Sequence, residues 1–175
     1  YKEKFILNII RQTNHLYRNI NHEKNYENKI IGCASLILIG LIFEEYKKFF
    51  NLGLEIIKKT INTNFDKDGF PYTRNIQELM ECLKYFIIIR EWIKESQTQI
   101  PEFLDNIIYN SGISFNFINE QLDKLPLFNG SSEIENKDFK PYLNLSGYTF
   151  KKKNNSISRG GYTILKNKKT LLIMD

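Results

Sequence analysis

Apolar residues recur with the period of an α-helix along the first 119 residues of the chain. In the segment 1–19, for example, Phe5, Ile9 and Leu16 fall on one side of a helix, because residues three, four or seven positions apart share a helix face. Polar or turn-forming residues separate five such segments. The pattern predicts five helices, at about residues 1–19, 26–46, 49–64, 74–96 and 101–118, the last opened by Pro101 in its first turn.

The second predicted helix differs from the others because it is apolar on nearly all sides between Ile30 and Phe43. A helix of this kind is typically buried among other helices. The apolar stretch is too short to cross a bilayer comfortably, so we expect a core helix and no membrane span. Small residues in it let neighbouring helices approach closely: Gly32, Ala34, Ser35 and Gly40.

The only two cysteines, Cys33 and Cys82, both fall within predicted helices. We expect them to be thiols of the core. Neither has the spacing to another cysteine or to a histidine that a metal site needs. The sequence therefore predicts neither a metal nor a cofactor.

The pattern changes after Asn119. Residues 161–165 and 170–174 read as strands and flank a polar turn, which is typical of a hairpin. A lone hairpin is only marginally stable, so we expect it to belong to a larger β domain that is cut off at Asp175. The chain is thus predicted to contain a helical part at 1–119, a linker at 120–145 and the start of a β domain at 146–175.

The chain has a net charge of +5, with 42% apolar and 26% charged residues, which is typical of a globular protein. The lysines are mostly scattered along the predicted helix faces, so we interpret them as a solvated surface. The run Lys151-Lys152-Lys153 is interpreted in the same way, as a solvated loop. No nucleic-acid-binding motif and no clustered arginine face accompany them, which makes a nucleic-acid binder the least favoured class.

The loop between the third and fourth predicted helices carries the most chemistry. Asp68-Gly69 is a tight-turn pair, and we expect Asp68 to set the turn. Tyr72, Arg74 and Asn75 follow within four residues and offer an aromatic hydroxyl, a guanidinium and an amide. Such a cluster, on a loop between rigid helices, can bind a carboxylate and stand near a proton to be moved.

Several short motifs, taken in order, resemble those of the heparinase II/III family of polysaccharide lyases. The matching segments are Arg11-Gln12 with His15-Leu16, the small-residue helix 32–40, Asp68-Gly69 with Arg74-Asn75, Phe128-Asn129-Gly130, and Ser146-Gly147-Tyr148. The last of these resembles the Ser-Gly-Tyr that opens the first strand of the family's β domain. The likeness runs through nearly the whole chain and points to a bacterial branch of the family.

The resemblance implies a mainly α fold: a partial (α/α) toroid of antiparallel helices followed by the first strands of a truncated β-sandwich domain. It also implies an acidic, uronate-containing polysaccharide as partner and β-elimination as the reaction. One group neutralises the uronate carboxylate, a base removes the C5 proton and an acid protonates the departing 4-oxygen. Our candidates for the catalytic roles are His15 and Tyr72, the latter displaced from the family's usual tyrosine position, and our candidates for substrate binding are Arg74, Asn75 and Asn129.

Each of these residues also has a plainer interpretation. Tyr72 packs over the helix ends, Arg74 forms a salt bridge or contacts loop carbonyls, and Asn75 caps the following helix. His15 is a satisfied buried histidine, and Asn129 belongs to an ordinary linker.

The loop departs from the family pattern at Pro71 and Ile76, where the family has histidine and proline. Glu78 and Leu79 stand near the position of a Tyr-His pair of the family. Further catalytic residues of the family belong to its sandwich domain, so we expect this chain alone to be inactive. The alternative function is a non-catalytic glycan-binding or scaffold protein of the same fold. The oligomeric state and the compartment, periplasmic or cytoplasmic in a bacterium, stay open.

Overall fold

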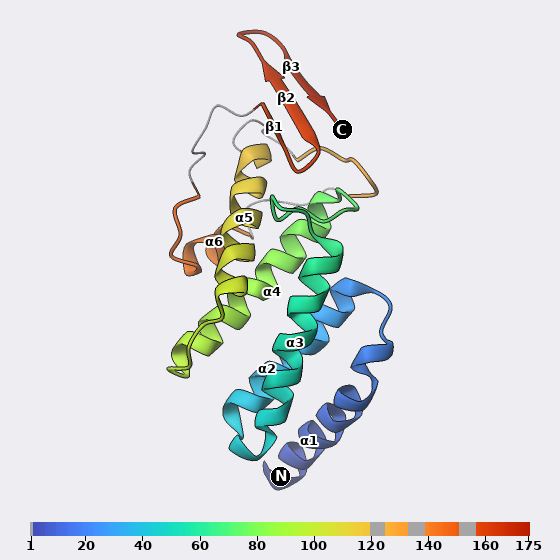
Figure 1. Ribbon diagram of the computed structural model, residues 1–175, viewed down its shortest axis with the longest axis vertical. Coiled ribbons are helices and arrows are strands. Elements are labelled where there is room, and N and C mark those ends of the chain that lie inside the picture. The colour runs from blue at the N-terminus through green and yellow to red at the C-terminus, as the bar shows by residue number, and fades with distance from the viewer. Residues whose placement is uncertain (1, 120–124, 133–138, 151–156) are drawn as a thin grey trace.

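The computed structural model describes residues 2–119, 125–132, 139–150 and 157–175. These ranges form a mainly helical body with a small antiparallel sheet at one end (Figure 1). Parts of the predicted linker 120–145, and the run Lys151–Lys153, lie outside the described residues. In the described ranges, no helix is both long enough and apolar enough to cross a membrane.

Five long helices make up the described part of the body, as the pattern predicts. They are α1 (Lys2–Asn19), α2 (Tyr26–Ile42), α3 (Lys47–Asn64), α4 (Ile76–Glu95) and α5 (Glu102–Asn119). Short 3-10 turns follow α1 at Ile20–His22 and precede α3 at Glu44–Tyr46. The bounds agree with the prediction to within a few residues. The largest difference is at the end of α2, because Phe43 leaves the helical conformation with φ −119° and ψ 113°.

The sequence predicts Pro101 in the first turn of its helix, but in the structure Pro101 lies just before the helix. The helix α5 begins at Glu102. The carbonyl oxygen of Pro101 accepts hydrogen bonds from the backbone N–H groups of Leu104 at 3.0 Å and Asp105 at 3.4 Å. Pro101 therefore opens the helix from the capping position, where a residue without an N–H leaves no donor unpaired.

The helix α2 lies at the centre of the core, packed against α3 and α4, and α4 in turn packs against α5. Cys33, Leu36 and Ile37 of α2 have no solvent exposure, and burying one leucine or isoleucine contributes roughly 1.5–3 kcal/mol. The predicted core helix is therefore confirmed. Cys33 and Cys82 are both buried free thiols, and burial raises the pKa of Cys33 to about 12, which makes an unreactive thiol.

Small residues set the distance between α2 and α3. A Cβ added to Gly40 would lie 2.5 Å from the backbone nitrogen of Phe50, and one added to Gly53 would lie 2.7 Å from the side chain of Ile37. A close-packed interior has no room for the added atom unless a helix moves. The close approach predicted for the small residues of α2 is thus present at Gly40. Gly53 of α3 likewise lets the two helices approach closely.

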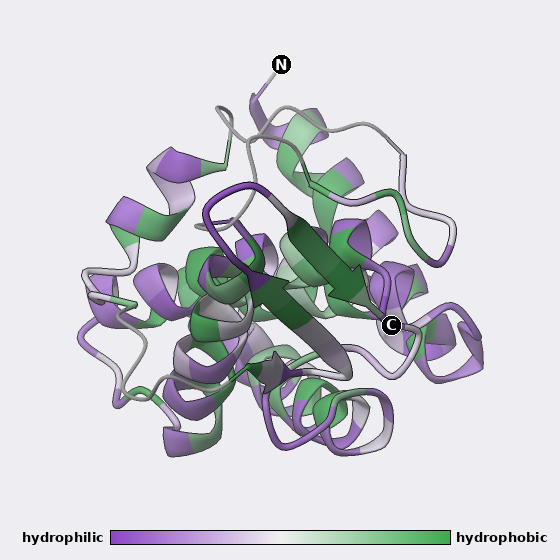
Figure 2. Cartoon of the chain, turned by 90° about the horizontal axis from the view of Figure 1, so that it is seen from above, coloured by the Kyte–Doolittle hydropathy of each residue, from purple (hydrophilic) through white to green (hydrophobic). Residues whose placement is uncertain are grey.

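The described sheet has three antiparallel strands in the order β1 (Ser158–Arg159), β2 (Tyr162–Lys166) and β3 (Leu171–Met174). In the β2–β3 hairpin, Thr163 pairs with Met174 and Lys166 pairs with Leu171, which confirms the predicted hairpin. Seen from above, the sheet lies over the ends of the helices (Figure 2). The toroid and the sandwich to which the resemblance assigns these elements stay predictions.

The chain packs once more on the helical body before it reaches β1. A short helix, α6 (Lys140–Leu145), packs against α4. Beside it, the ring of Phe139 makes an edge contact with that of Phe115 in α5, with centroids 4.9 Å apart. Farther along, the Phe150 ring lies so close to Gly112 of α5 that an added Cβ would be 2.2 Å from it. These contacts attach residues 139–150 to the helices.

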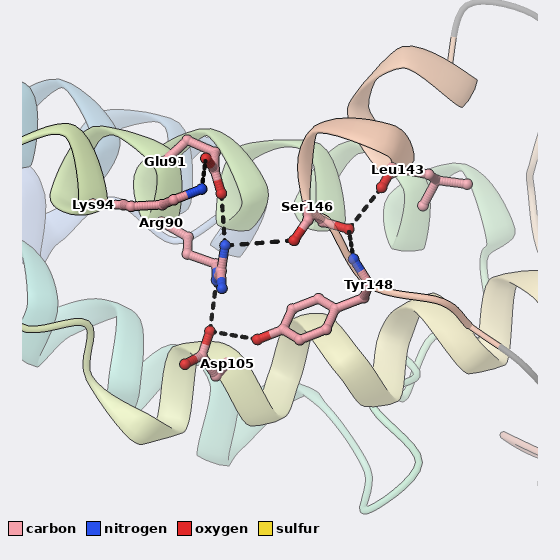
Figure 3. A network of polar contacts seen from close by, with 7 residues as sticks. All are labelled: Arg90, Glu91, Lys94, Asp105, Leu143, Ser146 and Tyr148. Atoms are coloured by element: carbon pink, nitrogen blue, oxygen red, sulfur yellow. Dashed lines mark hydrogen bonds and ion pairs between the residues drawn. The ribbon is translucent and has the colours of Figure 1, made fainter.

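Ser146-Gly147-Tyr148 does not open a strand, contrary to what the resemblance implies. Ser146 caps the end of α6, Gly147 has φ +69° and Tyr148 lies in irregular backbone. The Tyr148 hydroxyl instead joins a polar network between α4 and α5 (Figure 3), where it donates to Asp105 at 2.7 Å. Arg90 donates to the same oxygen at 2.6 Å and lies 5.0 Å from the centre of the Tyr148 ring. Tyr148 is thus held by contacts with the helices, not by pairing with a strand.

Candidate functional site

The loop between α3 and α4 is shaped by Asp66. Its Oδ1 accepts hydrogen bonds from the backbone N–H groups of Asp68 at 2.9 Å and Phe70 at 2.8 Å. Its carbonyl oxygen accepts one from the N–H of Gly69 at 3.0 Å, and Gly69 has φ +74°, a conformation that favours glycine. The prediction that Asp68 sets this turn is therefore wrong, because the aspartate that bonds its own backbone two residues on is Asp66.

Two buried serines of α5 fix the backbone of the same loop. Ser111 Oγ donates to the carbonyl oxygen of Gly69, and Ser114 Oγ donates to that of Asp68, both at 2.6 Å. Neither serine is exposed, so each bond satisfies groups whose burial would otherwise be costly. Sequence reasoning missed both residues. The signal that could have found them is a Ser-x-x-Ser pair on an otherwise apolar helix face.

Asp68 connects the loop to the sheet. Its carboxylate lies 3.7 Å from Nη1 of Arg159 and accepts a hydrogen bond from the backbone N–H of Gly160 at 3.3 Å. Arg159 also donates to Ser114 Oγ at 2.8 Å and to the carbonyl oxygen of Asp68 at 3.3 Å. Asp68 thus holds the β1–β2 turn against the loop and α5.

Arg74 and Asn129 hold the carboxylate of Asp175 between them. Arg74 Nη1 lies 2.8 Å from one carboxylate oxygen, and Asn129 Nδ2 donates to the other at 2.9 Å. The Arg74 side chain is 48% exposed, so the pair lies at the surface. The hydrogen bonds from Arg74 and then Asn129 lower the pKa of Asp175, and the same pairing raises the pKa of Arg74. The plainer interpretation of Arg74, a salt bridge, is confirmed, and its geometry is that of a two-donor carboxylate site.

Tyr162 of β2 fixes the backbone of Arg74. Arg74 has φ +54°, which is uncommon for a residue with a long side chain. The buried Tyr162 hydroxyl donates to the carbonyl oxygen of Arg74, which also accepts from Asn129 Nδ2 at 3.3 Å. The Tyr162 ring contacts those of Phe70 and Phe128, at centroid distances of 5.4 and 5.9 Å. Burial raises the pKa of Tyr162, so this residue is a neutral donor that holds Arg74 in place.

Asn75 caps α4, as its plainer interpretation predicts. Its Oδ1 accepts hydrogen bonds from the backbone N–H groups of Gln77 at 2.8 Å and Glu78 at 3.3 Å, which is the geometry of an N-cap. Its Nδ2 donates to the carbonyl oxygen of Asn129 at 3.1 Å. Asn75 is only 8% exposed, so its side chain positions Asn129 instead of facing solvent.

Tyr72 presents its side chain to solvent. Tyr72 is 64% exposed, so it is not packed over the helix ends as its plainer interpretation predicts. Its backbone is nevertheless anchored, because the Tyr72 N–H donates to the carbonyl oxygen of Asn64 at 2.9 Å. The phenol is therefore accessible to a ligand at a defined point, two residues before Arg74.

Glu78 joins this loop to the start of α2. Its Oε2 accepts hydrogen bonds from the hydroxyls of Tyr26 and Thr73. Burial first, and then the bond to Glu78, raise the pKa of Tyr26 far above its ordinary value, so Tyr26 is a neutral donor. Sequence reasoning missed this contact because Tyr26 and Glu78 are 52 positions apart.

His15 lies apart from this loop. It is exposed on α1 and lines a hollow of about 540 Å³ formed by the end of α1, the 3-10 turn after it and the start of α2. No residue of the loop 65–75 lines that hollow. The interpretation of His15 as a buried histidine is wrong, because the buried side of α1 is the one that carries Thr13.

Among the described residues, no group of three or more His, Cys, Asp or Glu side chains could hold a metal ion. Comparisons with protein-family models, with curated proteins and with solved structures return no match to this chain. What the site can do therefore follows from its own geometry: an arginine and an asparagine hold a carboxylate, next to an exposed tyrosine of the same loop.

Proposed function

We propose that this protein is a heparinase II/III-like polysaccharide lyase that cleaves an acidic, uronate-containing glycan by β-elimination. The observation that carries the proposal is the carboxylate held between Arg74 Nη1 and Asn129 Nδ2. In the structure Asp175 supplies this carboxylate, and in the proposal the uronate of the substrate takes its place. The half-exposed Arg74 side chain leaves room for a polymer to approach.

Arg74 has the role of neutralising the uronate. When the C5 proton leaves, negative charge spreads onto the carboxylate, and a fixed cation beside it stabilises that charge. A guanidinium suits this role because it stays protonated and donates through a rigid fork of N–H groups. The electron pair of the C5–H bond forms the C4–C5 double bond, the bond from C4 to the 4-oxygen breaks, and the departing oxygen takes up a proton.

Tyr72 is the residue to which we assign proton transfer. It is exposed on the same loop as Arg74, and a tyrosine can accept the C5 proton or donate one to the 4-oxygen. Tyr26 does not suit the base, because burial and its bond to Glu78 raise its pKa and keep it neutral. His15 lines a separate hollow, so the proposal gives it no part in the chemistry of this loop.

A non-catalytic glycan-binding or scaffold protein of the same fold is the second candidate. The hydrogen bonds among the polar side chains of the site favour this candidate, because these side chains mainly hold one another in place. Asn75 caps α4 and holds Asn129, while Asn129 donates to Arg74 and Asp175. Groups fixed in this way position a ligand, and binding alone needs no proton-transfer residue.

The two candidates differ in the product that they form. The protein in its full natural length is incubated with polygalacturonate, alginate, hyaluronan and heparin while the absorbance of unsaturated uronates is followed. For a lyase we expect product with at least one glycan, and a rate about a hundredfold lower in Arg74→Gln. Lys67→Gln, which removes an exposed cation of the same loop, serves as the matched control. Glycan binding without product from any of the four would reject the lyase and favour the binding protein.

A further inference from the structure

We propose that α1 and the turn after it form a second contact surface for the acidic polysaccharide, which ends in the hollow lined by His15, His22 and Lys24. The choice of an acidic glycan as occupant rests on the proposed function. The surface itself is inferred from the charge and shape of this part of the molecule.

This part of the molecule carries an excess of positive charge. Residues 2–25 contain five Lys or Arg residues against two Glu residues, an excess of three in a chain whose net charge is +5. The cations are Lys2, Lys4, Arg11, Arg18 and Lys24, and all of them are exposed. None forms an ion pair within the part of the chain that the structure describes. The charges of this region are therefore unbalanced, unlike those of a surface on which positive and negative side chains are equally mixed.

Three of these cations form a track along α1. Lys4, Arg11 and Arg18 are seven residues apart, which is close to two helical turns, so they fall on one side of the helix at intervals of about 10 Å. His15 lies four residues from Arg11 and belongs to the same side. Thr13, the buried residue of α1, lies on the other side, which faces α2. The track therefore faces solvent along the whole helix.

The track leads into the hollow at the end of α1. The hollow has a volume of about 540 Å³. Its basic side chains are those of His15, His22 and Lys24, and Asn19 and Asn28 add amide groups. Leu16 and Ile20 supply an apolar part of the lining, and Ile20 is held in place by its contact with Gly32 of α2. Apolar surface with a few polar groups around it is the usual make-up of a ligand site.

The acidic residue in this lining, Glu23, is engaged by a backbone N–H group. Glu23 accepts a hydrogen bond at its Oε1 from the backbone N–H of Asn25 at 2.9 Å, which stabilises the turn into α2. Lys24 and the two histidines are the basic side chains of the lining that can contact an anion. Attraction between a basic track and an extended polyanion acts along its length, speeds encounter and weakens as salt screens the charges.

Two triple variants of the full-length protein test this surface, each with three positive charges removed. Arg11→Gln, Arg18→Gln and Lys24→Gln remove charges of the track. Lys59→Gln, Lys166→Gln and Lys168→Gln remove the same number of exposed charges elsewhere. Binding of fluorescently labelled polygalacturonate is measured in low salt and at about 0.15 M salt. We expect the track triple to bind about tenfold more weakly in low salt and the control triple to change by about twofold or less.

A charge-preserving variant controls for an effect of the substitutions on folding. Arg11→Lys with Arg18→Lys keeps both charges, and we expect its binding to equal that of the unaltered protein. Equal weakening by the two triples, no weakening by the track triple, or tighter binding of duplex DNA than of polygalacturonate at the same salt would each overturn the inference.

The same samples separate this inference from the proposed function. If Arg74→Gln stops product formation while the track triple binds normally, the lyase stands and the second surface is wrong. If the track triple weakens binding but the unaltered protein forms no unsaturated product, the surface stands and the lyase is wrong.

Discussion

The helical core and the polar junction at its end are held together by different interactions. By polar junction we mean the contact between the loop 65–75, the segment 125–132 and the sheet. In the core, α2 and α4 bury apolar side chains such as Leu36, Leu83 and Phe86 without any exposure. In the polar junction, Arg74 and Asn129 are instead fixed by directional hydrogen bonds.

The difference separates stability from recognition. Burial of apolar area supplies most of the free energy of folding and tolerates little change in volume. Surface ion pairs contribute little to stability, but they can hold a charged group at a fixed point. We therefore expect substitutions in the core to unfold the protein, and substitutions in the polar junction to change binding with a smaller effect on stability.

The largest effect is expected from Phe86→Ala. Phe86 is fully buried in α4, so the substitution leaves a cavity and lowers the free energy of unfolding by about 3–5 kcal/mol. Denaturant unfolding followed by circular dichroism measures the loss. Phe86→Leu, which keeps most of the volume, is the control and should cost clearly less. A loss under about 1 kcal/mol in Phe86→Ala would contradict the role assigned to the core.

Gly69→Ala comes next and acts where the polar junction meets the core. The new Cβ would lie 2.6 Å from the backbone nitrogen of Ser111, at a residue with φ +74°. Strain and clash together should lower the free energy of unfolding by about 1–3 kcal/mol. Gly147→Ala is a matched control, because Gly147 has φ +69° but no atom within 4 Å of an added Cβ. An equal loss in both variants would show that the contact with Ser111 is unimportant.

Asn75→Ala should cost about 1 kcal/mol, because α4 loses its N-cap. The substitution also removes the bond to Asn129. Asn75→Asp keeps the capping oxygen and loses only the amide donor, so we expect stability close to that of the unaltered protein with weaker glycan binding. Thermal unfolding and glycan titration of both variants separate the two roles. Equal losses of stability would show that the cap is not what Asn75 contributes.

The smallest effect concerns pH. Arg74 and Asn129 lower the pKa of Asp175 below its ordinary value of 3.8. Since the pKa is depressed in the folded protein, the stabilisation is present above pH 3.8 and is lost as the pH falls through the lower, folded value. Carboxyl NMR titration should show a pKa below 3.8 in the unaltered protein and a rise in Arg74→Gln. Identical titrations of the two proteins would mean that the ion pair does not form in solution.

Local signals in the sequence account for most of the fold. The helical period predicts the five long helices, and the apolar stretch around Leu36 predicts the buried one. Asn75, placed just before an apolar helix, was recognisable as a cap. The hairpin also follows from alternation and turn residues. Each of these features depends on neighbours within one element, which is what a sequence pattern records.

The polar junction could be predicted only in part, because its contacts join distant segments. The family resemblance identifies Arg74 and Asn129 as candidate site residues. No local pattern in the sequence indicates that Tyr162 holds them in place. Likewise Asp66 and Asp68 are equally good turn formers in the sequence, and only the loop geometry assigns them different roles. The prediction for His15 is wrong although the helical period places it on the side of Arg11, opposite the buried Thr13; what the period does not indicate is that His15 borders a hollow.

The central claim is that the polar junction is a carboxylate site in which Asp175 stands for a uronate. The most direct measurement is the affinity of a uronate oligosaccharide for Asp175→Asn, Arg74→Gln and Glu55→Gln, the last removing an exposed acid of α3 as a control. The account predicts tighter binding in Asp175→Asn, because the internal carboxylate no longer competes. It also predicts binding roughly fivefold or more weaker in Arg74→Gln, and almost no change in Glu55→Gln. Equal tightening in the two acid variants, or unchanged binding in Arg74→Gln, would contradict it.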